Sequence, residues 1–190
     1  MKKYFCFDTE TGGLSEKASL LTLYGIIADE NLKPIDTIDL KLKPSDGVFL
    51  VEGRALEINR INLEHHSKIA DTYEIGAKKL KEFLSKHVPN HTRKMDIIGQ
   101  NVLEFDIPRV KNFLLADEEF SFYFSRETKD TKVQGIFLKS LGILPEDLNS
   151  SLVTQLKYFF PDLNVEGHHD AKWDAEHTLM LYEKQIHILD

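Results

Sequence analysis

Three short segments of this sequence carry acidic side chains at spacings that suit metal chemistry. The first runs Phe7-Asp8-Thr9-Glu10 and is followed by Thr11-Gly12-Gly13. On an extended chain, acids two residues apart point to the same side. Neighbouring carboxylates repel each other, and a divalent cation between them removes the repulsion. The competing interpretation is a strand that ends in a polar turn with solvated acids.

The second segment, 99–108, contains Asp106 two residues before Pro108. Proline is tolerated in the first turn of a helix, so this spacing predicts a helix that starts near Asp106. An aspartate before a helix is commonly an N-cap, and the residue taken alone favours capping over metal binding.

The third segment, 167–175, places His169 five residues before Asp174. Asp174 lies at the margin of the apolar stripe of the last expected helix, where a carboxylate needs a partner or a metal. The alternatives are a His–Asp salt bridge or a capping contact. Asp170, Asp174 and His177 also share one helix face, which offers a separate metal site. His168 is interpreted as a structural or solvated residue.

Hydrophobic periodicity predicts the elements that must position these residues. Strands are expected at 2–7, 20–28, 35–42, 95–98 and 120–124, and helices at about 73–87, 106–115, 130–141, 152–160 and 170–187. The first strand reads as buried on both faces. Three sequential strands followed by alternating helices and strands predict an α/β fold with a mixed sheet. The segment 43–72 has no clear pattern and is expected to be a long, irregular, functional loop.

The bulk composition describes an ordinary globular chain of 190 residues, and one domain, 1–190, is expected. The single cysteine, Cys6, excludes an intrachain disulfide and fits a reducing cytoplasm. No long apolar run predicts a membrane span, and the apolar run after Lys3 is too short for a signal peptide. We therefore expect a cytoplasmic protein. A net charge of −7 counts mildly against a sequence-reading DNA-binding protein.

Together, the three segments resemble the motifs of the DEDDh exonucleases, the DnaQ-like family of the ribonuclease-H-like fold. Asp8, Glu10, Thr11 and Gly12 match the D-x-E-T-G motif. Asn101, Phe105 and Asp106 match the second motif, and His169, Ala171 and Asp174 match H-x-A-x-x-D. The sister group carries a tyrosine four residues before the last aspartate, where this chain has Asp170. The histidine subgroup is therefore the better match.

The resemblance implies a central mixed five-stranded sheet, with its first three strands antiparallel, flanked by helices. It also implies a two-metal 3′→5′ exonuclease whose metal ligands are Asp8, Glu10, Asp106 and Asp174. Asp8 bridges both ions, Glu10 and Asp174 complete the first, and Asp106 serves the second. His169 is the general base. Carboxylate oxygens suit Mg²⁺ or Mn²⁺, and the sequence has no Cys/His cluster of the kind that binds zinc.

The same resemblance assigns substrate contacts. Thr11, Gly12 and Leu14 are expected to meet the terminal nucleotide, together with Asn59, Asn101 and Phe105. Phe105 is equally well read as a core residue. Arg54, Arg60, Lys68 and Arg109 are the basic candidates for phosphate contact.

The expected substrate is the 3′ end of single-stranded DNA or RNA, with DNA favoured, and a DNA polymerase is a further candidate partner. Two alternatives stay open. One is a nuclease of RNA or of short oligonucleotides, because the catalytic set is shared across substrates. The other is a non-catalytic subunit of a polymerase or another complex. The sequence does not determine oligomeric state or processivity.

Overall fold

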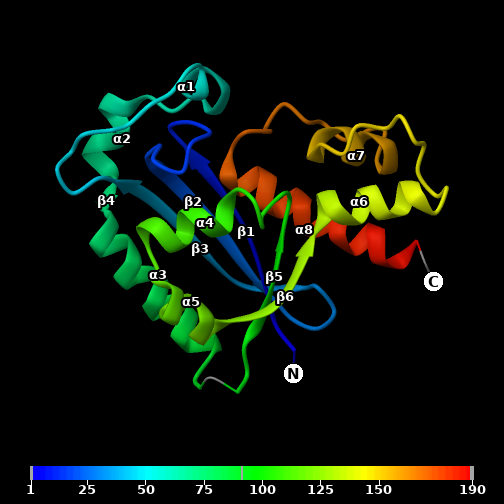
Figure 1. The fold of residues 1–190 in the computed structure, drawn as a ribbon, viewed down its shortest axis with the longest axis horizontal. Helices are drawn as coiled ribbons and strands as arrows, with labels where there is room; N and C mark the ends of the chain where they lie inside the picture. The colour runs from blue at the N-terminus through cyan, green and yellow to red at the C-terminus, as the bar shows by residue number, and fades with distance from the viewer. Residues whose placement is uncertain (1, 91, 189–190) are drawn as a thin grey trace.

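A mixed β-sheet forms the centre of the protein. The computed structural model describes residues 2–90 and 92–188. In this part of the chain the sheet has six strands in the order β4-β3-β2-β1-β5-β6 (Figure 1). The strands are β1 (Tyr4–Thr11), β2 (Leu20–Ala28), β3 (Pro34–Lys43), β4 (Asp71–Thr72), β5 (Met95–Gly99) and β6 (Phe124–Asp130).

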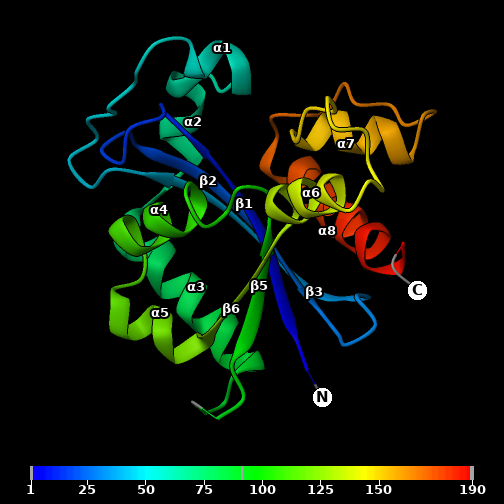
Figure 2. The ribbon, with the colours of Figure 1, turned by 45° about the vertical axis from the view of Figure 1, so that its right-hand side comes forward.

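Helices connect and cover the strands. They are α1 (Ala55–Asn59), α2 (Leu63–Ile69), α3 (Tyr73–His87), α4 (Asp106–Phe113), α5 (Asp117–Tyr123), α6 (Thr131–Ser140), α7 (Leu152–Phe159) and α8 (Ala171–His187). Figures 1 and 2 show α3, α4 and α5 on one side of the sheet and α8 on the other, with α6 and α7 beside α8. None of the described helices combines the length and the apolar character needed to cross a membrane.

The strand directions confirm the predicted mixed sheet with an antiparallel start. β1 pairs antiparallel with β2, and β2 with β3, while β5 and β6 run parallel to β1. The expected count of five strands is wrong, because β4 adds a sixth by pairing with the end of β3. β4 is only two residues long. A strand that short has no periodicity for a sequence pattern to reveal.

Side chains of β1 alternate between two cores. Phe5 and Phe7 lie in the cluster that includes residues of α3, α4 and α5. Cys6 points to the opposite face, where it packs with Ala171 and Ala175 of α8. The predicted burial of β1 on both faces is confirmed. Because the alternation has a period of two, it also decides which helix each following residue of the strand faces.

Two local predictions are wrong. The strand expected at 120–124 is instead the end of α5 followed by the start of β6. Phe120 and Tyr123 are both buried at helical spacing, and Glu119 accepts a hydrogen bond from the Ala116 N–H at 3.2 Å, which fixes the helix start. β6 is an edge strand of mostly polar residues, so it lacks an apolar signal.

The segment 43–72, expected to be irregular, contains α1, α2 and β4. The first helix has no buried residue. The second is capped by Asn62, whose side chain accepts a hydrogen bond from the His65 N–H at 3.0 Å. Short helices with few buried residues leave no apolar stripe, which explains why the pattern missed them.

Candidate metal centre and active site

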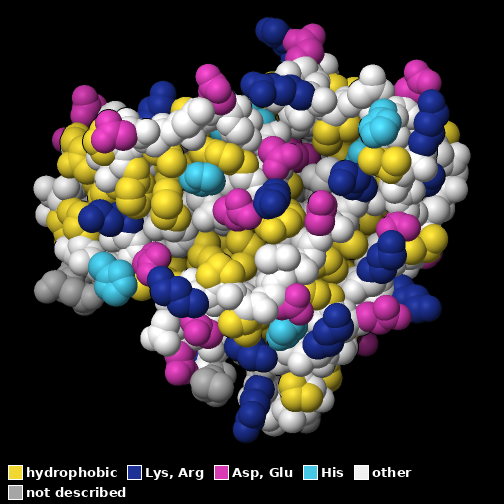
Figure 3. All heavy atoms as spheres, turned by 180° about the vertical axis from the view of Figure 1, so that it is seen from behind, with side chains coloured by type: hydrophobic (Ala, Val, Ile, Leu, Met, Phe, Trp, Pro, Cys, Tyr) yellow, Lys and Arg dark blue, Asp and Glu magenta, His cyan; other side chains and the backbone are white. Residues whose placement is uncertain are grey.

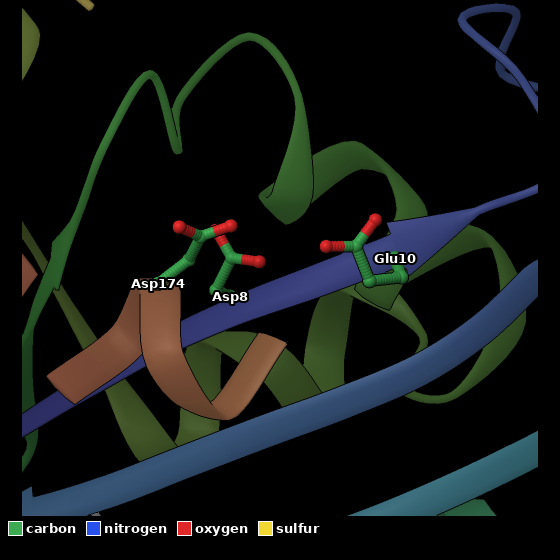
Figure 4. A group of neighbouring side chains, drawn as sticks. All are labelled: Asp8, Glu10 and Asp174. Atoms are coloured by element: carbon green, nitrogen blue, oxygen red, sulfur yellow. The ribbon is translucent and has the colours of Figure 1, made fainter. Parts of the chain in front are cut away.

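Three of the predicted acids gather beyond the end of the buried part of β1. Asp8 and Glu10 continue the face of Cys6, so they point toward α8, and Asp174 in the first turn of α8 points back toward them (Figure 4). One carboxylate oxygen from each of the three lies within 4.8 Å of the others. The alternation of the strand therefore assembles an all-oxygen cluster.

Asp106 joins the site from the other side of β1. Thr9 follows Phe5 and Phe7 on the face covered by α4. One oxygen of Asp106, Oδ1, accepts hydrogen bonds from the Thr9 N–H at 2.9 Å and the Thr9 hydroxyl at 2.6 Å. Asp106 is the first residue of α4, and Phe105 is its N-cap, so the capping interpretation of Asp106 is wrong.

Burial raises the pKa of all four acids. Burial, then the charges of Asp106, Asp174 and Glu10, raise the pKa of Asp8 well above its ordinary value. Burial, then the charges of Asp174, Asp106 and Asp170, raise the pKa of Glu10 to about 8. Burial raises the pKa of Asp174 to about 6 and of Asp106 to about 7. The site has an excess of negative charge that a divalent cation would neutralise.

His169 stands at the rim of this cluster. Its backbone has a positive φ of 66°, and its N–H donates to Asp174 Oδ2 at 3.0 Å. Partial burial, and then the charges of His168 and Arg60, lower the pKa of His169 below its ordinary value. An imidazole with a lowered pKa is neutral at physiological pH and can accept a proton. His168 lies beside it, with Nδ1 2.7 Å from the Val165 carbonyl, which agrees with a structural role.

The alternative metal face on α8 is not assembled. The Asp170 carboxylate caps the helix by accepting from the N–H groups of Lys172 and Trp173, both at 3.1 Å. The His177 ring stacks on Trp173 at a centroid distance of 3.7 Å. Among the described residues, the three-ligand group is Asp8, Glu10 and Asp174 instead.

The acids open into a cavity of about 510 Å³. Its lining includes five of the predicted substrate contacts: Thr11, Leu14, Asn59, Asn101 and Phe105. Gly12 is outside the lining, because its N–H donates to the Ser19 carbonyl at 2.8 Å and its carbonyl accepts from the Glu52 N–H at 2.7 Å. A Cβ atom at position 12 would clash with the Leu50 carbonyl oxygen. Glycine is therefore needed there for the backbone of residues 50–52 to pass so close.

Two of these residues, Asn59 and Asn101, also form hydrogen bonds within the protein. The Asn59 amide donates to the Thr11 carbonyl at 3.1 Å and forms a hydrogen bond that partly offsets the raised pKa of Glu10. Asn101 has a positive φ of 58°, and its N–H donates to Asp130 Oδ1 at 3.0 Å. Asp130 thus holds the loop that leads to Asp106, a role that sequence reasoning missed.

Arg109, a candidate for phosphate contact from the sequence, is buried. It is 1% exposed, and its guanidinium donates to the carbonyls of Phe105 at 2.7 Å and Leu14 at 2.5 Å. The guanidinium also lies over the Phe105 ring at 3.5 Å. Arg109 therefore joins the loops that carry Leu14 and Phe105 and is not an open phosphate contact. Phe105 itself is half-buried at the cavity wall.

Sequence reasoning also missed several residues of the cavity wall. They include Gln100, Ile58 and Glu52. Gln100 stands within the second motif segment, so its position was a usable signal. Glu52 binds the Ser15 N–H at 3.0 Å across a separation of 37 residues, and no local pattern marks such a pair.

Comparison with known proteins gives this arrangement its structural context. E. coli exonuclease I in complex with a dT13 oligonucleotide matches with a TM-score of 0.77, over 100% of this chain and 43% of that chain, at 17% identity. Exonuclease I from Methylocaldum szegediense matches with a TM-score of 0.76, over 96% of this chain and 40% of that chain, at 19% identity. The chain has the fold of exonuclease I. The predicted ribonuclease-H-like fold class is therefore confirmed.

Other comparisons give partial or distant matches. A zinc-bound E. coli exonuclease I–single-stranded DNA complex matches with a TM-score of 0.75 over 96% of this chain and 40% of that chain, at 18% identity. COP9 signalosome complex subunit 5 of Saccharomyces cerevisiae is 26% identical over 134 residues, which are 68% of this chain and 29% of that protein. This chain thus spans less than half of these proteins. No protein-family model matches it.

Proposed function

We propose that this protein is a metal-dependent exonuclease that removes nucleotides from the 3′ end of single-stranded DNA. The observation that carries the proposal is the convergence of Asp8, Glu10 and Asp174, with oxygens within 4.8 Å of one another. Asp106 is buried beside them, and His169 lines the same cavity. The fold shared with exonuclease I supports the same conclusion.

The donor set fits two divalent cations such as Mg²⁺ or Mn²⁺. It consists of carboxylate oxygens, which these ions prefer. Asp8, Glu10 and Asp174 would hold one ion, and Asp106, with Asp8, would hold the second. When bound, such ions neutralise the phosphoryl oxygens and lower the pKa of water.

The protein's own residues supply positioning and proton transfer. His169 accepts the proton of the attacking water, and its backbone contact with Asp174 keeps it near the cluster. Attack on phosphorus breaks the bond to the O3′ of the preceding nucleotide, and that oxygen takes a proton from solvent. The products are a nucleoside 5′-monophosphate and a strand with a new 3′ hydroxyl group.

The walls of the cavity suit a nucleoside. Leu14 is 85% exposed and Ile58 51% exposed, and both line it with Phe105. Apolar and aromatic faces contact bases with little sequence preference. The similar structures of exonuclease I with bound DNA oligonucleotides support DNA as the polymer. A polymerase partner stays a prediction.

The test is a time course on 3′- and 5′-labelled single-stranded DNA and RNA of one sequence. Each is incubated with Mg²⁺, Mn²⁺ or EDTA, and the unaltered chain is compared with Asp8→Ala. Metal-dependent shortening of DNA from its 3′ end, lost in the variant, is the expected result. Shortening of RNA alone would assign the other polymer. Cleavage of neither would contradict the proposal and favour a binding subunit.

A further inference from the structure

A second hollow adjoins the candidate active site, between α6 and the connection that leads to α7. It encloses about 720 Å³ and shares Gln100 and Asn101 with the cavity of the carboxylates. Residues 146–152 and the α6 residues Lys132, Ile136 and Lys139 form its other walls. Figure 2 shows α6 and this connection beside the loop that follows β5.

Two lysines in this hollow carry charge that no carboxylate neutralises within the described residues. Lys132 Nζ donates to Asn101 Oδ1, and Lys139 Nζ donates to the Leu148 carbonyl, both at 2.9 Å. Both lysines are half-buried, and both acceptors are neutral. An ammonium group has three donors, so each lysine can still bind an anion. Glu146 and Asp147 are exposed residues of the same walls.

Basic residues elsewhere near the site are differently placed. Arg54 binds the Glu57 carboxylate at 2.5 Å. Lys172 lies 4.0 Å from Glu176 in a separate hollow, which Arg60, His168 and His169 also line. Figure 3 shows the face opposite to Figure 1, where Lys and Arg side chains are dispersed among Asp and Glu. The hollow under α6 therefore places two lysines that make no ion pair within the described residues directly beside the cavity.

The wall between the two spaces is held in place by buried amides. Gln100 Nε2 donates to the Ser150 carbonyl at 2.8 Å, and Gln155 Nε2 donates to the same oxygen at 3.0 Å. The Thr131 hydroxyl donates to Gln100 Oε1 at 2.6 Å. A wall fixed in this way needs little ordering when a ligand binds.

The hollow under α6 adjoins the space in which the phosphate would react. It shares Gln100 and Asn101 with the cavity of the carboxylates. A smaller hollow is lined both by Asp8 and His169 of the site and by Ser151 and Leu152 of the walls under α6. The strand upstream of the terminal nucleotide can therefore continue from the cavity into the hollow under α6.

We propose that the hollow between α6 and residues 146–152 binds the phosphodiester backbone of the nucleotides upstream of the terminal one. Lys132 and Lys139 contact the phosphates, and Ile136, which is 49% exposed, contacts a sugar or base. This inference rests on the proposed exonuclease function and adds a second site to it. The enzyme then prefers substrates of several nucleotides to isolated phosphodiesters.

Lys139→Ala tests this site without touching the catalytic cavity. Lys132 is less suitable, because it holds Asn101. Two substrates are compared: the 4-nitrophenyl ester of thymidine 5′-monophosphate, which reaches only the cavity, and a single-stranded thymidine octanucleotide. In Lys139→Ala, we expect KM for the octanucleotide to rise about fivefold, as for the loss of one exposed ion pair. KM and kcat for the small ester stay within about twofold.

Two further variants serve as controls. Lys139→Arg keeps both the charge and a donor for the Leu148 carbonyl, and it should restore the octanucleotide KM. Lys172→Ala removes the lysine of the other hollow and should leave the octanucleotide KM unchanged. A larger effect of Lys172→Ala, or equal effects of Lys139→Ala on both substrates, would overturn the proposal. If the unaltered chain cleaves neither substrate, the proposed function fails, and this site fails with it.

Equilibrium binding provides a readout that does not depend on turnover. Fluorescence anisotropy with labelled thymidine oligonucleotides is measured at several salt concentrations in an Asp8→Asn background. Adding Lys139→Ala should weaken octanucleotide binding and reduce the slope of log affinity against log salt by about 0.7, as for one lost phosphate contact. An unchanged slope and affinity would show that the hollow does not contact the strand.

Discussion

At the residue scale, the candidate site depends on four carboxylates that cannot all be charged without a counter-ion. Asp8 lies among the other acids, and burial and four neighbouring acids raise its pKa. Glu10 and Asp174 are its partners in the cluster, and Asp106 approaches from the other face of β1. Removing one charge from this group should therefore affect stability and activity in opposite directions.

Asp8→Asn tests this opposition. The change keeps the shape but removes the central negative charge, so we expect kcat to fall by about 10³-fold or more. In the absence of metal, Tm should rise, because an uncompensated buried charge has been removed. Activity assays and thermal melts in EDTA measure the two effects. A variant that loses both activity and Tm would show that Asp8 serves the fold instead of a metal.

His169→Gln tests the general base. We expect kcat to fall by about 10²- to 10⁴-fold, while Tm changes little because the imidazole is exposed at the rim. In the unaltered protein, the rate of the chemical step should fall in acid as His169 becomes protonated. The midpoint should lie below the ordinary histidine value, because the pKa of His169 is lowered. Single-turnover rates between pH 5 and 8 measure this, and the variant should lack the histidine-dependent limb.

At the element scale, the alternation of side chains along β1 places the acids, and Arg109 connects the loops that form the cavity wall. Asp8 and Glu10 face α8, whereas Thr9 faces α4 and holds Asp106. The Arg109 guanidinium donates to the carbonyls of Leu14 and Ser15, which are 95 and 94 residues away in the chain. It also donates to the carbonyl of Phe105, four residues before it. Loss of this residue should loosen the cavity wall without altering the metal ligands.

Arg109→Met makes this prediction measurable. The change leaves the carbonyls of Leu14 and Phe105 without their buried donor, so the free energy of unfolding should fall by about 3 kcal/mol. Lys111→Met on the same helix removes an exposed pair with Asp117 and should cost less than about 1 kcal/mol. Urea unfolding of both variants measures the difference. Equal costs would contradict a special role for Arg109.

At the scale of the whole molecule, the acidic site links folding to pH and to divalent cations. The pKa of Glu10 is about 8 in the folded protein, against about 4.3 in an unfolded chain. Between these two values the folded state holds protons that the unfolded state has lost. Stability is therefore highest below the unfolded value and falls as pH rises toward about 8.

Thermal melts across this range test the linkage. Without metal, Tm should fall from pH 5.5 to pH 8, and Mg²⁺ or Mn²⁺ should raise it more at pH 8, where the ligands are ionised. Asp174→Asn should flatten the pH dependence and reduce the effect of metal. A Tm that is independent of both pH and metal would contradict a cation site at these residues.

The sequence alone determined the acids, the histidine and most of the helices. Asp8, Glu10, Asp106, His169 and Asp174 stand in short segments whose spacing is visible without a structure. The buried pattern of β1 and the long apolar stripe of α8 are equally local. Local periodicity records which face of an element is buried, so such features can be read directly from the chain.

The tertiary structure decided which of these residues meet and what surrounds them. Taken alone, Asp106 resembles a helix cap, and its contact with Thr9, 97 residues away in the chain, places it beside the other acids. Arg109 was a candidate for phosphate contact but is buried between two loops. The polar edge strand β6 and the hollow beside α6 left no pattern. Contacts between distant segments form across the sheet, and no periodicity along one segment encodes its partner.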